Sequence, residues 1–236
     1  MLAVSLGASA LHATLSFIGS VTERQALSEQ HAVLNGSQAP GRPLLDLFLQ
    51  LVSITNGLAP VVLVLYLLVR NGEAPASIGV DLSQPRRDLL RGAALGAVIG
   101  GGGLGLYYLA FRAGIALNIV AANLPDVWWR IPVLLLSALQ DGLLEEVVVI
   151  GYLLSRLRLI GLTPVSAVAI EAAFRGSYHL YQGFGAFIGN AIMGVIFGTL
   201  FLRWRRANPM IIAHFLINAV AFIGYTYLAP RISWLP

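Results

Sequence analysis

Long apolar stretches recur along the whole chain and constrain its fold more than any other feature of the sequence. Charged residues make up only 11% of the 236 residues, and the mean hydropathy is +0.78. A soluble domain of this length needs more charge to cover its surface, whereas helices that face lipid need almost none. A membrane-spanning helix requires about 20 predominantly apolar residues. The sequence therefore predicts an all-α, polytopic bundle of transmembrane helices.

Seven stretches are long and apolar enough to be membrane helices, and no repeat or linker divides them. We therefore expect one integral membrane domain over residues 1–236, located in the cell membrane with the lipid bilayer as its surroundings. The third stretch is long enough to be tilted or to end in an interfacial segment, and residues 22–42 are expected to form an exposed polar loop. The stretches cover residues 1–20, 44–69, 92–120, 127–153, 162–182, 184–202 and 208–229.

Arginine is distributed unevenly between the segments that connect these stretches. The first and third connections hold Arg24, Arg42 and Arg130, with Arg112 at an ambiguous position. The positive-inside rule therefore predicts that the even-numbered connections and the N-terminus are cytoplasmic. Because the basic residues lie in short connections, the positive net charge indicates membrane orientation and not nucleic acid as a partner. Nine arginines flank the second, fourth and sixth connections: Arg70, Arg86, Arg87, Arg91, Arg156, Arg158, Arg203, Arg205 and Arg206.

Small and aromatic residues indicate how the helices pack and where the bilayer ends. Gly92, Gly96 and Gly100 recur every four residues, and Gly194 and Gly198 repeat this spacing. Small residues at this spacing allow two membrane helices to approach closely. Indole and guanidinium groups at the start of the fourth stretch predict an interfacial belt. The residues of this belt are Trp128, Trp129 and Arg130.

A small set of polar residues lies inside the predicted apolar helices. One carboxylate or arginine at the centre of a membrane helix costs about 2.5–3.5 kcal/mol. These residues must therefore face one another or water within the bundle. For Glu171 and Arg175, which are four residues apart, a buried structural ion pair is the simpler interpretation. The set consists of Gln140, Asp141, Glu145, Glu146, Glu171, Arg175, His179, Asn190, His214 and Asn218.

Hydrolysis of a peptide bond inside a membrane needs an activated water and hydrogen-bond donors for the tetrahedral oxyanion. Glu145, assisted by His179, is a candidate to take the proton from water. His214 and Asn218, one helical turn apart, are candidates to donate hydrogen bonds to the oxyanion. The polar set therefore contains the groups that this reaction requires.

We expect Arg175 to be a supporting residue whose positive charge holds the second carboxylate, Glu146, and thereby keeps Glu145 oriented. Ser155 and Ser177 lie nearby in the sequence, but no Gly-x-Ser-x-Gly nucleophile turn is present. The chain has no cysteine, which excludes disulfides and thiolate catalysis. Two histidines and a carboxylate are ligands of many zinc sites, but His-Glu-x-x-His is absent. We therefore expect no cofactor, with a divalent metal such as zinc as the alternative.

Three short motifs occur in order on three predicted membrane helices. Residues 145–150 are Glu-Glu-Val-Val-Val-Ile, residues 175–179 are Arg-Gly-Ser-Tyr-His, and residues 214–218 are His-Phe-Leu-Ile-Asn. Their order and spacing resemble the CPBP family of intramembrane proteases, which includes type II CAAX prenyl endopeptidases and bacterial Abi proteins. The motifs of that family are Glu-Glu-x-x-x-Arg, Phe-x-x-x-His and His-x-x-x-Asn or Asp. The resemblance covers about residues 131–225, which would form the catalytic core.

This resemblance implies an intramembrane endopeptidase that acts on a membrane-associated peptide or protein. By resemblance, Glu145 and His179 activate the water, and His214 and Asn218 form the oxyanion site. The complete absence of lysine suggests a GC-rich bacterial source, for which a CAAX-prenylated substrate is not expected. A break in the fifth helix near Gly176 would bring His179 to the depth of Glu145.

Two positions depart from the family pattern. Ile150 replaces the arginine of the first motif, and Arg175 replaces the phenylalanine of the second. We interpret this exchange as relocation of the counter-ion for the two glutamates from the fourth helix to the fifth. Without such a relocation, the carboxylate pair would be a degenerate site in a non-catalytic member.

Two other classes of function fit the same residues. Buried carboxylates and histidines relay charge in proton-coupled transporters, although such proteins usually contain inverted repeats, and this sequence has none that we detect. A non-catalytic membrane scaffold or immunity protein would keep the polar cluster for structural reasons. Cleavage of a membrane peptide, proton-dependent uptake, or neither would distinguish these three classes.

Overall fold

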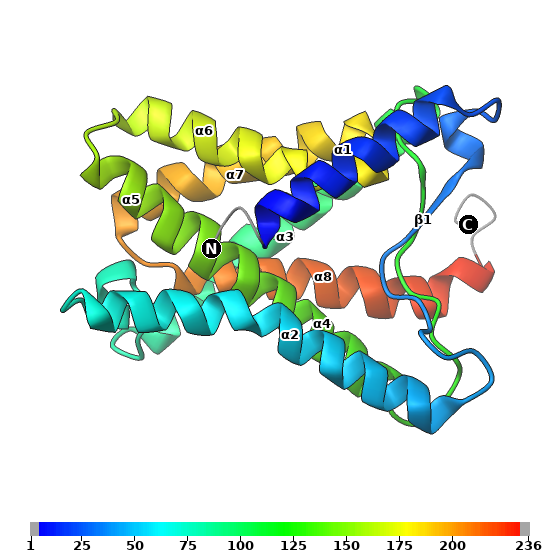
Figure 1. Ribbon diagram of the computed structural model, residues 1–236, viewed down its shortest axis with the longest axis horizontal. Helices are drawn as coiled ribbons and strands as arrows, with labels where there is room; N and C mark the ends of the chain where they lie inside the picture. The colour runs from blue at the N-terminus through cyan, green and yellow to red at the C-terminus, as the bar shows by residue number, and fades with distance from the viewer. Residues whose placement is uncertain (1–4, 232–236) are drawn as a thin grey trace.

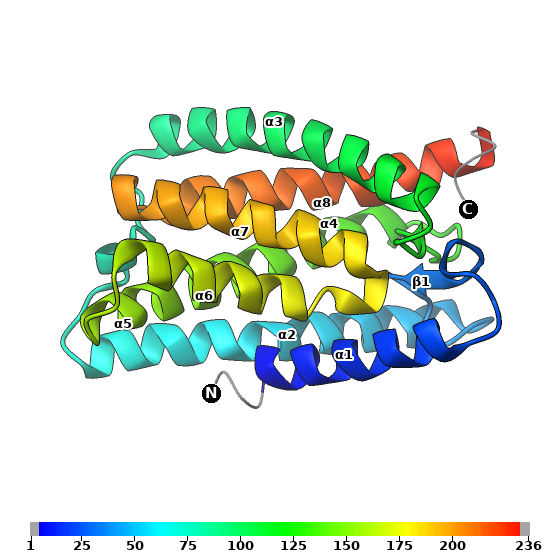
Figure 2. The ribbon, with the colours of Figure 1, turned by 90° about the horizontal axis from the view of Figure 1, so that it is seen from above.

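The computed structural model describes residues 5–231, and their fold is a bundle of helices (Figure 1). The helices run roughly along the long axis of the bundle and alternate in direction, as Figure 2 also shows. The bounds of the α-helices are α1 Leu6–Thr22, α2 Pro43–Arg70, α3 Pro85–Arg112, α4 Arg130–Glu145, α5 Leu154–Leu159, α6 Pro164–Ser177, α7 Phe184–Trp204 and α8 Asn208–Leu228. The predicted first stretch begins with residues that lie outside the described range.

Short helical segments and strands connect these helices. A π-helical segment, η4 (Glu146–Leu153), joins α4 to α5 without a break. Two strands, β1 (His31–Val33) and β2 (Asn118–Val120), lie at one end of the bundle. The 3₁₀ segments are η2 Leu27–Glu29, η3 Pro75–Ile78, η5 Leu180–Gln182 and η6 Ala229–Arg231.

Four helices of the described part are long and apolar enough to cross a membrane: α2, α3, α7 and α8. Helix α1 has 17 residues and α6 has 14, so both are shorter than these four helices. Helix α4 has 16 residues and becomes as long as the four only when η4 and α5 are added to it. The prediction of an all-α transmembrane bundle is confirmed, whereas the count of seven spans is not.

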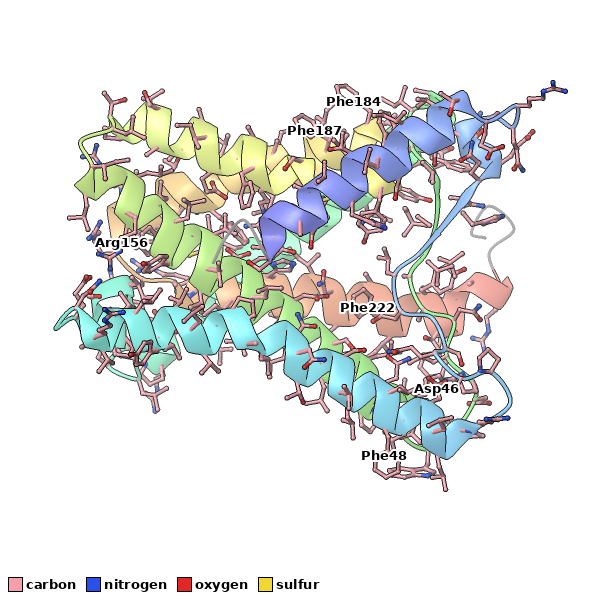
Figure 3. All side chains as sticks on the ribbon, in the orientation of Figure 1. Asp46, Phe48, Arg156, Phe184, Phe187 and Phe222 are labelled. Atoms are coloured by element: carbon pink, nitrogen blue, oxygen red, sulfur yellow. The ribbon has the colours of Figure 1, made fainter. Side chains whose placement is uncertain are left out.

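The connections alternate between the two ends of the bundle in the order that the sequence predicts (Figures 1 and 2). In Figure 3, Arg156 lies at the end that holds the even-numbered connections, and Asp46 lies at the opposite end. The nine arginines counted above flank connections at the Arg156 end. The cytoplasmic location of that end stays a prediction.

The third predicted helix is wrong at its C-terminal end. Helix α3 stops at Arg112, and Gly114 follows with a φ of +72°, a conformation that glycine adopts readily. Residues 118–120 then form β2, which pairs in parallel with β1 inside the predicted polar loop. The Asn35 side chain extends the contact by donating a hydrogen bond to the Ala121 carbonyl. Pairing between two distant connections overrode the apolar character of the segment.

Glycines bring α3 against α8 and α7 against α6, as their spacing predicts. A Cβ atom at Gly92 would lie 2.6 Å from the side chain of Ile212, and one at Gly96 would lie 3.3 Å from the Ala213 carbonyl. A Cβ atom at Gly194 would lie 2.9 Å from the Cα atom of Ala172. Larger residues would separate these helix pairs.

The predicted interfacial belt is wrong for one of its two indoles. Trp128 is 78% exposed, but Trp129 is buried beside Val133 and Leu134 in the core. Consecutive residues at a helix start point in directions about 100° apart, so only one of the two rings faces outward. Arg130 forms an ion pair with Asp126 at 2.8 Å.

A polar clamp holds the turn between α7 and α8 against the start of α3. Arg206 is buried and donates hydrogen bonds to Asp88 at 2.6 Å and to Asp81 at 3.0 Å. Gly79 has a φ of +69°, and a Cβ atom there would lie 2.1 Å from the Cα atom of Arg206. The backbone approaches this closely only because residue 79 is glycine.

We expect Asp81 to make the stability of the protein sensitive to acid. The hydrogen bond from Arg206 lowers the pKa of Asp81 from 3.8 to about 2. A carboxyl whose pKa is lower in the folded state stabilises the fold above its unfolded pKa, and this contribution is lost as the pH falls towards the folded value. Thermal unfolding between pH 4 and pH 2 should therefore show a steeper loss of stability in the wild type than in Asp81→Asn.

Circular dichroism in detergent measures this difference. Thr55→Val, at an exposed position of α2 without a titratable group, provides the control and should keep the wild-type slope. Parallel pH profiles for wild type and Asp81→Asn would contradict the role of Asp81.

Candidate active site

Two adjacent carboxylates lie at the junction of α4 and the π-helical segment η4. Glu145 is the last residue of α4 and Glu146 the first of η4, with 8% and 0% exposure respectively. Every residue from 146 to 151 is buried, so this part of the chain has no face towards lipid. π-helical turns are rare and frequently occur at functional sites. The π segment therefore places both carboxyl groups inside the bundle.

Arg175, on α6, is the cation between these carboxylates. Its Nη2 atom lies 2.5 Å from Glu146 Oε1 and 3.2 Å from Glu145 Oε2, and the side chain is fully buried. The expected contact between Arg175 and Glu146 is present. Arg175 reaches Glu146 from a different helix, as the relocated counter-ion requires.

The predicted ion pair between Glu171 and Arg175 is wrong. Both carboxyl oxygens of Glu171 are buried without a hydrogen-bond partner among the described residues. Glu171 packs instead beside Gly194 and Gly198 of α7, where added Cβ atoms would lie 3.2 and 3.1 Å from its oxygens. Helical spacing alone favoured the i, i+4 pair, but two carboxylates on η4 and α4 compete for the same guanidinium.

His214, on α8, contacts the second carboxylate of the pair. Its Nδ1 atom lies 2.7 Å from Glu146 Oε1 and 3.2 Å from Arg175 Nη2. One turn later, Asn218 donates a hydrogen bond to Asp141 Oδ2 at 3.1 Å. Asp141 therefore belongs to the same polar cluster, one turn before Glu145 on α4.

His179 lies just beyond the end of α6. The helix stops at Ser177, and a Cβ atom at Gly176 would lie 2.8 Å from Phe187 of α7, so the glycine permits the sharp return of the chain. The predicted helix over residues 162–182 is thus too long, and the expected break near Gly176 is present. His179 Nε2 lies 3.7 Å from Glu145 Oε1, and its Nδ1 atom lies 3.1 Å from the Arg175 carbonyl.

Comparison with protein-family models gave a match over residues 127–220, to the model described as type II CAAX prenyl endopeptidase Rce1-like. This segment is similar to the Rce1-like family. It covers less than half of the chain and contains α4, η4, α5, α6 and α7 with most of α8. Neither the curated proteins nor the solved structures gave a match.

The Rce1-like segment holds the three predicted motifs, and the fold brings them together. The first motif lies at the junction of α4 and η4, the second at the end of α6, and the third on α8. Their residues meet through the contacts described above: Glu145, Glu146, Arg175, His179 and His214. Asn218 reaches this group through Asp141. The bundle interior thus contains one connected polar network.

Tyr178 is a member of this network that the sequence analysis missed. Its hydroxyl donates a hydrogen bond to Glu145 Oε2 at 2.9 Å, and the side chain is buried. An aromatic residue in an apolar stretch normally indicates core packing. The position of Tyr178, directly before His179 in the second motif, was the available signal.

Three polar residues from the predicted helices do not join the network. Asn190 donates to the Ala186 carbonyl on its own helix, and Ser177 donates to the Phe174 carbonyl. Gln140 packs against α2, where a Cβ atom at Gly57 would lie 2.7 Å from its amide carbon. These contacts are structural.

Glu145, Glu146 and His214 are the one group of potential metal ligands among the described residues, with ligand atoms within 4.8 Å of one another. The Arg175 guanidinium lies among the same carboxylates and already supplies positive charge to them. A divalent cation at this position would be repelled by the guanidinium at short range. Two carboxylates and an imidazole are common metal ligands, but the nearby guanidinium makes this group less suitable for a divalent cation.

We expect Arg175→Met to destabilise the protein by about 3–5 kcal/mol, because Glu146 would be left buried without its ion partner. The double variant Arg175→Met/Glu146→Gln should lose less than the sum of the two single variants, by about 2 kcal/mol, since the residues are in contact. Chemical denaturation in detergent provides these free energies.

Arg203→Met is the matched control for this cycle. Arg203 is exposed at the end of α7, so its replacement should change the unfolding free energy by about 0.5 kcal/mol or less. Additive effects of the Arg175 and Glu146 substitutions would refute their coupling.

Proposed function

We propose that this chain is an intramembrane endopeptidase that hydrolyses a membrane-associated peptide or protein with a water activated by Glu145 and His179. The observation that carries the proposal is the 3.7 Å separation between Glu145 Oε1 and His179 Nε2. The similarity of residues 127–220 to the Rce1-like model supports the protease class. The assignment of Glu145 and His179 as the residues that activate the water rests on the orientation of Glu145 Oε1 and His179 Nε2.

The partners of Glu145 and His179 leave one acceptor atom on each for the water. Glu145 Oε2 is engaged by the Tyr178 hydroxyl and by Arg175. His179 Nδ1 donates to the Arg175 carbonyl, so Nε2 of the neutral ring carries a lone pair. A water that donates one hydrogen to Oε1 and one to Nε2 directs its own lone pair away from both. This orientation suits attack on a carbonyl carbon.

Proton transfer follows from the same contacts. As the water oxygen bonds to the carbonyl carbon, Glu145 takes the proton and the carbonyl oxygen becomes an oxyanion. Glu145 then returns the proton to the amine nitrogen as the C–N bond breaks. Arg175 and Tyr178 keep the carboxyl group in place during both steps.

His214 and Asn218 are the proposed donors to the oxyanion. In the imidazolium form, His214 donates from Nδ1 to Glu146 and has Nε2–H available for the substrate. Asn218 uses one amide hydrogen for Asp141 and retains a second. Glu146 therefore acts as a positioning residue, since it orients both His214 and Arg175.

We expect Glu145→Gln to lower kcat by about 10²- to 10⁴-fold, because an amide cannot accept the proton of water. Purified wild type and variant would be incubated with a fluorogenic library of membrane peptides. Glu73→Gln is the matched control, since Glu73 pairs with Arg156 outside the site and should retain wild-type activity.

Three outcomes separate the classes of function. Cleavage that Glu145→Gln abolishes supports the endopeptidase. Equal rates of cleavage by wild type and Glu145→Gln would contradict the role of Glu145 as the general base. Proton-dependent uptake into vesicles without cleavage would support a transporter, and the absence of both activities would support a scaffold.

The proposed mechanism uses no metal, because Arg175 supplies the cation among the carboxylates. Activity should therefore stay within about twofold of its initial value after prolonged dialysis against a chelator, a change of less than half a kcal/mol. Loss of activity that added zinc restores would contradict this part of the proposal.

A further inference from the structure

A cavity of about 670 Å³ lies beside the proposed active site and is not used by the mechanism above. One wall is α1, which lies outside the Rce1-like segment. The opposite wall includes His31 and Ala32 of β1, with Leu117 just before β2. Tyr178 and Tyr181, which flank the end of α6, complete the lining.

Helix α1 lines this cavity with four polar side chains and with Ala8 and Ala13. Ser9, His12, Ser16 and Ser20 are spaced by three or four residues and therefore share one face of the helix. Leu15, on another face of the helix, is exposed and is not part of the lining. Hydroxyl and imidazole groups both donate and accept hydrogen bonds. This face suits a polar occupant such as a peptide backbone.

Strand β1, two of whose residues line the same cavity, has an edge that pairs with no other described strand. The Leu34 N–H donates to Val120 and the Gln30 carbonyl accepts from Asn118, so the even-numbered residues bond to β2. In a parallel ladder the intervening residues direct their backbone groups to the other side. The backbone of His31 and Val33 therefore faces away from β2, and the sheet has only two strands.

Tyr178 connects the cavity to the proposed catalytic carboxylate. Its side chain lines the cavity, and its hydroxyl donates to Glu145 at 2.9 Å. An occupant of the cavity therefore lies one side chain away from the general base. Its position suits the part of a substrate that flanks the bond to be cleaved.

We propose that this cavity binds an extended peptide segment of the substrate, which adds to the outer edge of β1 and contacts the polar face of α1. Addition of a strand to an open edge is a general mode of peptide recognition, in which backbone hydrogen bonds provide affinity. This inference rests on the proposed function for the identity of the substrate. It assigns α1 and β1 a role in substrate specificity.

A crosslinking experiment tests the occupant without requiring cleavage. The chain has no cysteine, so Ser16→Cys introduces a single thiol into the cavity. The probe is a synthetic peptide with about 20 leucine and alanine residues, followed by about six alternating threonine and valine residues, one of which is replaced by cysteine. Both partners are mixed in vesicles under mild oxidation, with Glu145→Gln in the protein to prevent cleavage.

The control is Leu15→Cys, one residue away on the exposed face of α1. Disulfide formation with Ser16→Cys several-fold above that with Leu15→Cys supports the proposal. Equal formation, or more with Leu15→Cys, overturns it.

A second experiment separates the backbone of β1 from its side chain. His31→Pro removes the edge N–H, and proline is accepted at the first position of a strand after an extended residue such as Gln30, whose ψ is 152°. His31→Ala removes only the imidazole. For a cleaved library peptide that carries a long flanking segment, KM should be about three- to tenfold higher in His31→Pro than in His31→Ala, with kcat unchanged.

A truncated peptide without the flanking segment should show the same KM for both variants. Equal KM values for the long peptide would overturn strand addition while leaving the endopeptidase intact. If no peptide is cleaved by wild type, the proposed function fails and the crosslinking result still decides whether the cavity binds an extended segment.

Discussion

The structure of the polar network depends on one buried guanidinium. Arg175 contacts both carboxylates of the pair and lies near His214, so it neutralises charge that would otherwise be isolated in an apolar bundle. Breaking a buried ion pair costs several kcal/mol, whereas keeping it intact costs much less. The positions of Glu145, Glu146 and His214 are therefore consequences of where this single side chain lies.

Two irregularities of the backbone allow the network to form. The π segment starts at Glu146, and α6 stops at Ser177, so neither helix continues regularly past its functional residues. The first irregularity buries the carboxylates, and the second turns His179 back towards Glu145. The regular helices provide the frame, since glycines on α3 and α7 hold α8 and α6 at close distance.

The sequence was sufficient to predict the transmembrane bundle, the alternation of its connections and the convergence of the three motifs. The length of an apolar stretch and the spacing within a motif can each be read from one segment of the sequence, and folding does not change them. The strand pair was missed because its stability comes from contact between residues about 90 positions apart, which neither segment reveals alone. Tyr178 was not assigned to the site because an aromatic residue in an apolar stretch normally packs in the core. Asp141 was recognised as an intramembrane polar residue, but it lies outside the three motifs, and its contact with Asn218 depends on how α4 and α8 pack. Glu171 was assigned the wrong partner because helical spacing ignores competition from other helices.

The short connection between Arg175 and His179 has a mechanical consequence. Arg175 lies in the last turn of α6 and His179 just beyond its end, and the Arg175 carbonyl accepts a hydrogen bond from the imidazole of His179. A displacement of α6 would therefore move the Arg175 guanidinium together with the imidazole that we propose to activate water. A change in lateral pressure or bilayer thickness that displaces this helix would therefore alter two properties of the network together. These are the balance of charge around the two glutamates and the position of the His179 imidazole.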